Sequence, residues 1–334
     1  MPTAQDFAAH SQPVIGIPVV GVRLLSSQTS QTSDTPSSQT SETSQTPPKA
    51  AARRRAKGVL ESTMLFSTYN IHYGVGADGK YDVARIADAV AQADIVCLQE
   101  TVRGWPQNDY ADQTAEIGRR LNRYFRFHGP MEADASTVEA DGRIVNRRRS
   151  FGNAIVSRWP ILWSRGVMLP KMRLMEGFDL QRGYIEAAIA VPSGPLRVYC
   201  THLSHVGPRQ RLPQVAALME GVKRAALSGG TWDGTAPDSF MWQEPAPAVP
   251  ASAIVAGDFN FTPRHPEYPE MICDLADAWT AAGNSEEEVD SFPREGRIDH
   301  VFVTHDLVPK LKKAWIGYGI EASDHWPVFV EFDL

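Results

Sequence analysis

The sequence predicts an α/β fold, built as one domain with two β-sheets. Its first strongly patterned part alternates strand and helix patterns, which is typical of α/β folds. Its two halves share a rhythm of short apolar strands that end in acidic or amide side chains. No stretch between residues 64 and 334 has the composition of a linker, so a single domain is expected there.

The elements follow from hydrophobic periodicity and turn formers. Short apolar runs predict strands over residues 64–74, 94–100, 151–161, 253–260, 297–304 and 324–334. Residues 182–205 predict two more strands, joined by the turn Pro192-Ser-Gly-Pro195. Apolar residues at helical spacing predict helices over residues 80–93, 109–125, 209–226 and 265–283. The Gly/Pro-rich residues 228–252, which include Trp232 and Trp242, predict a long loop that serves as a substrate lid, as an interface element or as neither.

Residues 1–63 have a different composition from the rest of the chain. They contain a Ser/Thr/Gln repeat that cannot bury enough apolar surface to fold, so we expect a disordered and dispensable extension. The apolar residues 14–22 lack a preceding basic region and a small-residue cleavage site, so no signal peptide is predicted. Residues 64–334 are then expected to form the catalytic domain.

Composition limits the classes of function. A hydrophobic content of 43% and a charged content of 22% are typical of globular proteins. The net charge of −6 provides no general basic surface for nucleic acid, although a local basic patch would still allow such a partner. No apolar run approaches the roughly 20 residues that span a bilayer.

The three cysteines are Cys97, Cys200 and Cys273. Their number is odd and their spacing fits no metal motif, so we expect free, buried thiols in a reducing compartment. This expectation favours a cytoplasmic protein, and we expect a monomer.

Polar side chains gather at the ends of the predicted strands. They are Asn70, Glu100, Asn153, His202, Asp258, Asn260, Asp299, Asp324 and His325. Oxygen ligands suit Mg²⁺, with Mn²⁺ as the alternative, whereas Zn²⁺ would require more His or Cys. Asp258 and Asn260 lie two residues apart on a predicted strand, so their side chains should face the same side. The alternative for Gly257–Pro263 is a plain turn, since Asp and Asn favour turns.

The chain resembles the endonuclease/exonuclease/phosphatase superfamily of metal-dependent phosphoesterases. The matching pieces are TYNIHYG, DIVCLQE, GNAIVSR, THLSH, GDFN, RIDHVFV and SDHWPV, which occur in the family's order and span residues 64–334. The resemblance implies a DNase I-like four-layer α/β sandwich, with two mixed β-sheets packed face to face and helices outside. It also implies Mg²⁺-dependent hydrolysis of a phosphate ester, a phosphodiester by preference, through an activated water. A DNA or RNA nuclease of the same fold and a non-catalytic binding protein on this scaffold are the alternatives.

The resemblance also implies roles for single residues. Glu100 would be the principal metal ligand, with Asn70 and Asp324 as further ligands. Asp258 would orient or deprotonate the attacking water, and Asn260 would hold the phosphate or a metal ion.

The histidines have implied roles as well. His325 would act on the phosphate or as a base, with Asp299 as its partner. His202 would contact the phosphate or protonate the leaving group, and its sequence Cys-Thr-His-Leu-Ser-His stands where AP endonucleases have Tyr-x-Pro-Asn. Asn153 would support substrate binding, or serve as a structural amide.

Four further residues have two interpretations each. His72 would face the cleft or the solvent. His205, Arg209 and Arg211 could contact substrate, but the two arginines fit a solvated helix start better.

Overall fold

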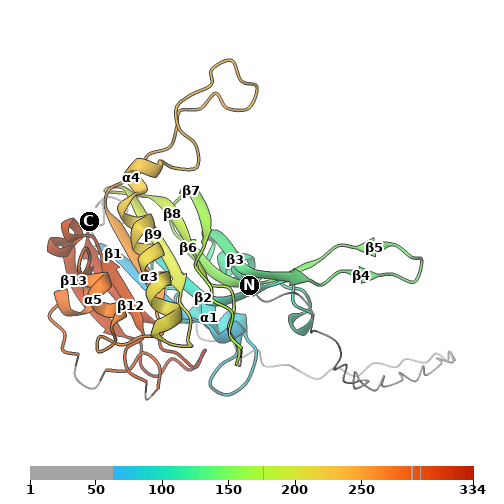
Figure 1. Ribbon diagram of the computed structural model, residues 1–334, viewed down its shortest axis with the longest axis horizontal. Helices are drawn as coiled ribbons and strands as arrows, with labels where there is room; N and C mark the ends of the chain where they lie inside the picture. The colour runs from blue at the N-terminus through green and yellow to red at the C-terminus, as the bar shows by residue number, and fades with distance from the viewer. Residues whose placement is uncertain (1–62, 176, 287–288, 294) are drawn as a thin grey trace, which may run out of the picture. The chain divides into compact units, whose positions relative to one another are not determined.

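The computed structural model describes residues 63–334, apart from residues 176, 287–288 and 294 (Figure 1). The predicted extension therefore lies outside the described residues, except for Thr63, which already belongs to the first strand. Among the described residues, no helix has both the length and the apolar character to cross a bilayer.

The first sheet has the strand order β13-β14-β1-β2-β6-β3. Its strands are β1 (Thr63–Asn70), β2 (Ile95–Arg103), β3 (Tyr124–Asp134), β6 (Arg148–Ser157), β13 (Leu311–Ile316) and β14 (Val328–Asp333). Only β1 and β2 run parallel to each other, so their carboxyl ends meet at one edge of the sheet.

The second sheet has the order β11-β12-β10-β9-β8-β7 and repeats this plan. Its strands are β7 (Ile161–Met168), β8 (Gly183–Val191), β9 (Gly194–His202), β10 (Ala253–Asp258), β11 (Ala276–Asp277) and β12 (Asp299–Val303). Here β9 and β10 form the parallel pair. Each sheet therefore presents one pair of parallel strand ends, and both pairs contribute side chains to the site described below.

Three apolar clusters produce the layers. The central cluster joins the sheets face to face, with Phe66 and Ile155 from the first and Val198 and Ile254 from the second. The outer clusters pack α1 and α2 on the first sheet and α3 and α5 on the second, and Figure 1 shows α3 and α5 over their sheet. The predicted four-layer sandwich, with two mixed sheets and helices outside, is confirmed.

Apart from α3, the helices are short. They are α1 (Val83–Ala89), α2 (Gln113–Leu121), α3 (Pro208–Lys223), α4 (Ala225–Ser228), α5 (Glu267–Ile272) and α6 (Ala278–Ala281), with 3-10 turns η1 (His72–Gly74), η2 (Pro106–Asn108) and η3 (His305–Lys310). Asp82 and Asp112 accept backbone N–H groups at the starts of α1 and α2, as N-cap residues do.

Two predicted helices were too long. The helix expected over residues 109–125 covers only Gln113–Leu121, because Asn122 adopts a left-handed conformation that ends α2 and leads into β3. The helix expected over residues 265–283 is two short helices separated by β11. Asp277 explains the break, since its carboxylate accepts from the Trp279 backbone N–H and also binds the buried Arg297.

Several edge features had no clear signal in the sequence. Strands β3, β7 and β13 were not predicted, and neither was the small hairpin of β4 (Thr137–Val138) and β5 (Ile144–Val145) that projects from β3 and β6 (Figure 1). Edge strands make fewer core contacts, so their hydrophobic alternation is weaker.

The loop over residues 228–252 lies away from the predicted site. Ala248 accepts a hydrogen bond from the Trp163 indole, and Trp163 pairs with Ala188, whereas His202 pairs with Gly183 at the other end of β8. Five strand residues separate these positions, which is about 17 Å at the usual rise. The lid interpretation of this loop is therefore wrong.

Two expectations about single side chains were also wrong. Cys97 and Cys200 are buried as expected, but Cys273 is exposed. Arg209 is exposed as expected, but Arg211 is buried, and its Nε lies 2.7 Å from the carboxylate of the buried Glu267. This ion pair ties the start of α3 to α5, a long-range contact that helical periodicity cannot reveal.

We expect Arg211→Met to lower the free energy of unfolding by about 3–5 kcal/mol, because it leaves the Glu267 carboxylate buried and unpaired. Chemical denaturation measures this change. Arg209→Met is the matched control, since it alters an exposed arginine two residues away and should change stability by less than about 0.5 kcal/mol. Equal effects of the two substitutions would show that the buried pair is unimportant.

Candidate active site

The site lies where the parallel strand ends of both sheets meet. In the second sheet, strand register places His202, Asp258 and Asp299 in one row, because Asp258 pairs with His202 on β9 and with Asp299 on β12. Gly257 permits the close approach of β10 to β9, since a Cβ there would lie 1.9 Å from the Thr201 carbonyl oxygen. The glycine before Asp258 is therefore required by strand packing, which a plain turn would not need.

Glu100 occupies a strained position in β2. Its φ is 57°, and the pairing of β2 with β6 shifts register between Leu98 and Thr101. A bulge of this kind redirects a side chain. A left-handed backbone at a residue other than glycine is strained, and such strained residues cluster at functional sites. The Glu100 Oε2 atom is buried and has no hydrogen-bond partner among the described residues.

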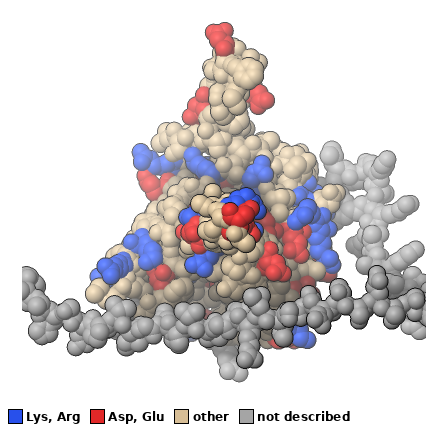
Figure 2. All heavy atoms as spheres, turned by 90° about the vertical axis from the view of Figure 1, so that its right-hand side faces the viewer, with Lys and Arg blue, Asp and Glu red and all other residues tan. Residues whose placement is uncertain are grey.

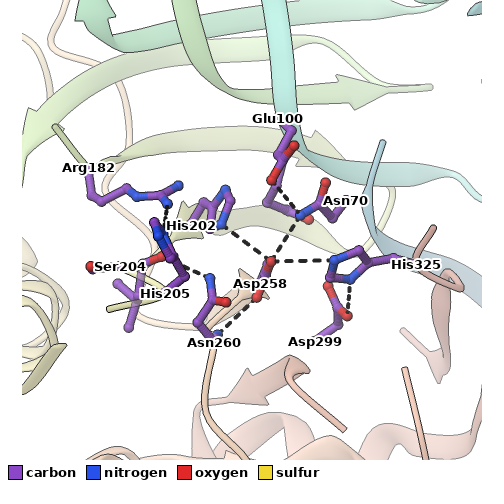
Figure 3. A network of polar contacts seen from close by, with 12 residues as sticks. Asn70, Glu100, Arg182, His202, Ser204, His205, Asp258, Asn260, Asp299 and His325 are labelled. Atoms are coloured by element: carbon purple, nitrogen blue, oxygen red, sulfur yellow. Dashed lines mark hydrogen bonds and ion pairs between the residues drawn. The ribbon is translucent and has the colours of Figure 1, made fainter. Parts of the chain in front are cut away.

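Asn70 links the two sheets at the end of β1. Its amide nitrogen donates to Glu100 Oε1 at 3.3 Å and to Asp258 Oδ2 at 2.9 Å (Figure 3). Its amide oxygen accepts from the His72 backbone N–H at 3.1 Å. Asn70 therefore holds the two carboxylates in a fixed relation.

Asp258 is the centre of the network. Its Oδ2 lies 3.3 Å from His202 Nε2 and 3.9 Å from His325 Nε2, and its Oδ1 accepts from the Asn260 backbone N–H. Burial and then the charge of Asp299 raise the pKa of Asp258 to about 7, against the lowering effect of His325. A carboxylate with this pKa can accept a proton near neutral pH.

The two imidazoles on either side of Asp258 differ in charge. Burial, and then the positive charge of Arg182, hold the pKa of His202 well below its usual value, so this ring is neutral. Burial alone would also lower the pKa of His325, but the Asp299 carboxylate, 2.9 Å from its Nδ1, contributes most to raising it to about 10. Asp258 therefore lies between a neutral imidazole and an imidazolium.

The comparisons with known proteins agree with this geometry. The sequence profile described as the Endonuclease/Exonuclease/phosphatase family matches residues 67–325. The chain belongs to this family. The predicted family is thereby confirmed, and membership makes the protein a hydrolase of the phosphoesterase or nuclease type. A search of curated proteins found no match.

Solved structures of the family share the fold. One from Beutenbergia cavernae is 22% identical, with a TM-score of 0.56, over 81% of this chain and 72% of that one. The human Nocturnin catalytic domain is 18% identical, with a TM-score of 0.54, over 81% and 93% of the chains. A mannosyl-6-phosphatase from Bacteroides thetaiotaomicron is 19% identical, with a TM-score of 0.50, over 80% and 98%. Identities this low show the fold and leave the substrate open.

A divalent metal could bind either at a cluster of three residues or at Glu100. Within the described part of the chain, Asp258, Asp299 and His325 place ligand atoms within 4.8 Å of one another. Both His325 nitrogens are directed at carboxylates, however, and an imidazolium has no lone pair for a metal. Glu100 fits better, because its unpartnered, buried Oε2 is an oxygen ligand of the kind Mg²⁺ takes.

The carboxylate of Asp324 contacts Ser323 and His72 rather than the central network. It accepts from the Ser323 hydroxyl and lies 3.6 Å from His72 Nδ1. Burial, and then the negative charges of Glu100 and Asp324, raise the pKa of the Tyr73 hydroxyl to about 12. The charges of Glu100 and Asp324 therefore both act on Tyr73. His72 therefore lies beside Asp324, which agrees with the interpretation that it faces the cleft.

Asn260 and Asn153 reach their positions in unexpected ways. Asn260 has a φ of 53°, so the expectation that it shares an extended strand with Asp258 was wrong, although it still adjoins that residue (Figure 3). Its amide nitrogen donates to the Leu203 carbonyl. Asn153 donates to the Gly183 carbonyl of the facing sheet, a structural contact, while its oxygen is buried without a partner in the described chain.

Arg182 belongs to the site but was not predicted from the sequence. Its guanidinium is 4% exposed, and its Nη2 lies 3.2 Å from His205 Nδ1. Its Nε and Nη1 atoms are buried and have no hydrogen-bond partner among the described residues. Arg182 directly precedes β8, and the pairing of Gly183 with His202 places it beside the site.

Proposed function

We propose that the protein is a Mg²⁺-dependent phosphoesterase that hydrolyses a phosphodiester by attack of a water molecule held at Asp258. The observation that carries this proposal is the position of Asp258 Oδ2, 3.3 Å from His202 Nε2 and 3.9 Å from His325 Nε2. Asp258 as a base, His325 as a cation and His202 as a neutral donor thus meet in one buried network. Phosphoryl transfer needs groups of these kinds.

Each residue has a distinct part in the proposed reaction. Asp258 accepts a proton from the attacking water, for which its raised pKa is suited. The His325 imidazolium, oriented by Asp299, stabilises negative charge on the phosphoryl oxygens. The neutral His202 donates a hydrogen bond from Nε2 to Asp258 or to the departing oxygen, which takes its proton from solvent. Arg182 pairs its unpartnered N–H groups with a phosphate oxygen.

The metal would be held chiefly by Glu100, with Asp324 as a further ligand and Asn70 beside them. When bound, it would supply Lewis-acid stabilisation of charge on the phosphate. Asn260 lies next to Asp258, and its amide oxygen would suit a metal-bound water better than a phosphate oxygen, since amide and phosphate oxygens are both acceptors.

The test is a panel of DNA, RNA, nucleotides, sugar phosphates and phospholipids, each assayed with Mg²⁺, with Mn²⁺ and with EDTA. We expect hydrolysis of at least one phosphodiester that EDTA abolishes and Mg²⁺ restores. Binding of phosphate esters without turnover of any would favour the non-catalytic scaffold instead. Duplex DNA is not expected to be a good substrate, because the net charge of −6 provides no general basic surface for it. The face drawn in Figure 2 likewise intersperses acidic and basic side chains.

Arg182→Ala should lower kcat/KM by roughly 10- to 100-fold, because a hydrogen bond from a charged group contributes about 1.5–3 kcal/mol. The buried, unpartnered guanidinium motivates this expectation. Steady-state kinetics on one substrate measures it, and inhibition by inorganic phosphate should weaken in parallel. Arg209→Ala, at an exposed position, is the control. Unaltered phosphate inhibition in Arg182→Ala would remove Arg182 from the phosphate site.

A further inference from the structure

A cavity of about 450 Å³ adjoins the site on the side of β2 and β6, and its walls are mostly apolar. Five of its lining residues are aromatic: Tyr73, Tyr81, Trp105, Phe151 and Phe178. A volume of this size accommodates a small organic group. The reaction proposed above does not use this cavity.

The cavity and the catalytic network share a wall. Tyr73, which lines the cavity, lies close enough to Glu100 for that carboxylate to raise the pKa of its hydroxyl. The Phe151 ring, which also lines the cavity, lies 6.2 Å from the His202 ring. The Arg182 guanidinium lies 5.9 Å from the centre of the same Phe151 ring. A phosphate at the network could therefore carry a substituent directly into the cavity.

The aromatic side chains are held in place before any ligand binds. The Tyr73 and Phe151 rings lie 5.9 Å apart. The Trp105 indole donates to the Ser150 carbonyl at 2.8 Å, and the Arg149 guanidinium lies 5.2 Å from its ring centre. Fixed aromatic faces bind planar rings well, because little side-chain entropy is lost on stacking.

Asn108, like its neighbour Gln107, places a side-chain amide in this mostly apolar lining. Both the nitrogen and the oxygen of its amide are buried, and neither has a hydrogen-bond partner among the described residues. An aliphatic chain in the cavity would leave this donor and acceptor unpaired, which is unfavourable. The edge of a heteroaromatic ring offers a matching acceptor and donor, as adenine does to an asparagine.

We propose that this cavity binds the nucleobase of the substrate, so that the phosphoester cleaved here is a nucleotide or a single-stranded nucleotide end. The inference rests on the proposed function for the position of the phosphate. One nucleoside needs no extended basic groove, so the proposal agrees with the net charge of −6.

The test is calorimetric titration of the full chain with three phosphomonoesters: adenosine 5′-monophosphate, ribose 5-phosphate and hexyl phosphate. Stacking of a base on aromatic side chains is strong enough that we expect adenosine 5′-monophosphate to bind at least about tenfold tighter than ribose 5-phosphate. Equal affinities, or no binding of adenosine 5′-monophosphate, would overturn the proposal. Hexyl phosphate binding as tightly as the nucleotide would also overturn it, in favour of an aliphatic pocket.

Three variants locate the effect. Trp105→Ala and Asn108→Leu should each reduce the preference for the nucleotide, by about tenfold for the former, and leave the affinity for ribose 5-phosphate unchanged. Trp242→Ala removes a tryptophan from the distant loop and should retain the full preference. A preference that survives in both cavity variants, with melting curves like those of the unaltered chain, would overturn the assignment.

Binding and turnover separate the two proposals. A chain that prefers the nucleotide but hydrolyses nothing would contradict the proposed function alone. A chain that hydrolyses a phospholipid phosphodiester and shows no nucleotide preference would contradict only the cavity assignment.

Discussion

Glu100→Ala should reduce hydrolysis by at least about 10³-fold, because it removes the main proposed ligand of the metal. A bound metal supplies several kcal/mol of charge stabilisation in the transition state, and each 1.36 kcal/mol corresponds to a factor of ten in rate. The strained backbone and the unpartnered Oε2 of Glu100 motivate this expectation. The measurements are kcat with saturating Mg²⁺ and calorimetric binding of Mn²⁺ to the unaltered and substituted chains.

The binding measurement makes the interpretation independent of activity. Glu100→Ala should weaken Mn²⁺ binding and keep a cooperative thermal transition. Glu132→Ala, which alters an exposed carboxylate on β3, is the control and should change neither quantity. Full Mn²⁺ affinity in Glu100→Ala would move the metal elsewhere, with Asp258, Asp299 and His325 as the alternative group.

Asp258→Asn should lower kcat by about 10²–10⁴-fold, the usual effect of removing a general base. An amide cannot accept the proton, but it has the size of the carboxylate and can still accept from Asn70. We therefore expect the fold and most of the Mn²⁺ affinity to persist. Asp238→Asn, on the exposed part of the loop, is the control. A raised KM with an unchanged kcat would show that Asp258 only binds substrate.

His325 and Asp299 should act as one unit. His325→Ala is expected to cost a factor similar to that of Asp258→Asn, and Asp299→Asn somewhat less, because Asp299 orients and stabilises the imidazole. The double substitution should be little worse than His325→Ala alone, since residues in one hydrogen-bonded unit are not additive. His305→Ala, an exposed histidine, controls for the loss of an imidazole. Additive losses in kcat would contradict the coupling.

The layers of the fold follow from the sequence because periodicity reports burial. Strands β1, β2, β9 and β10 pack against the other sheet on one face and against a helix layer on the opposite face. Their apolar runs are therefore nearly continuous, which made them easy to predict. Strands β3 and β7 lie at sheet edges, where one face is exposed and the apolar pattern is weak. The break between α5 and α6 depends on Asp277 binding Arg297, a contact across 20 residues.

Part of the site could also be predicted from the sequence. Residues at the ends of strands could be found by reading the sequence, because a polar side chain that directly follows a buried apolar run lies where the strand reaches the edge of its sheet. The sequence by itself thus determined the family, the layered fold and the polar residues Asn70, Glu100, His202, Asp258, Asp299 and His325 as candidates.

The tertiary structure alone decided how those residues interact. The charges of the two histidines differ because His202 lies near Arg182 and His325 lies against Asp299, and neither neighbour is close in the sequence. Arg182 reaches the site through the register of β8 with β9, and the aromatic cavity forms because the end of β2 meets β6. Protonation and cavity shape depend on distances between segments that the chain separates, and local sequence patterns carry no information about those distances.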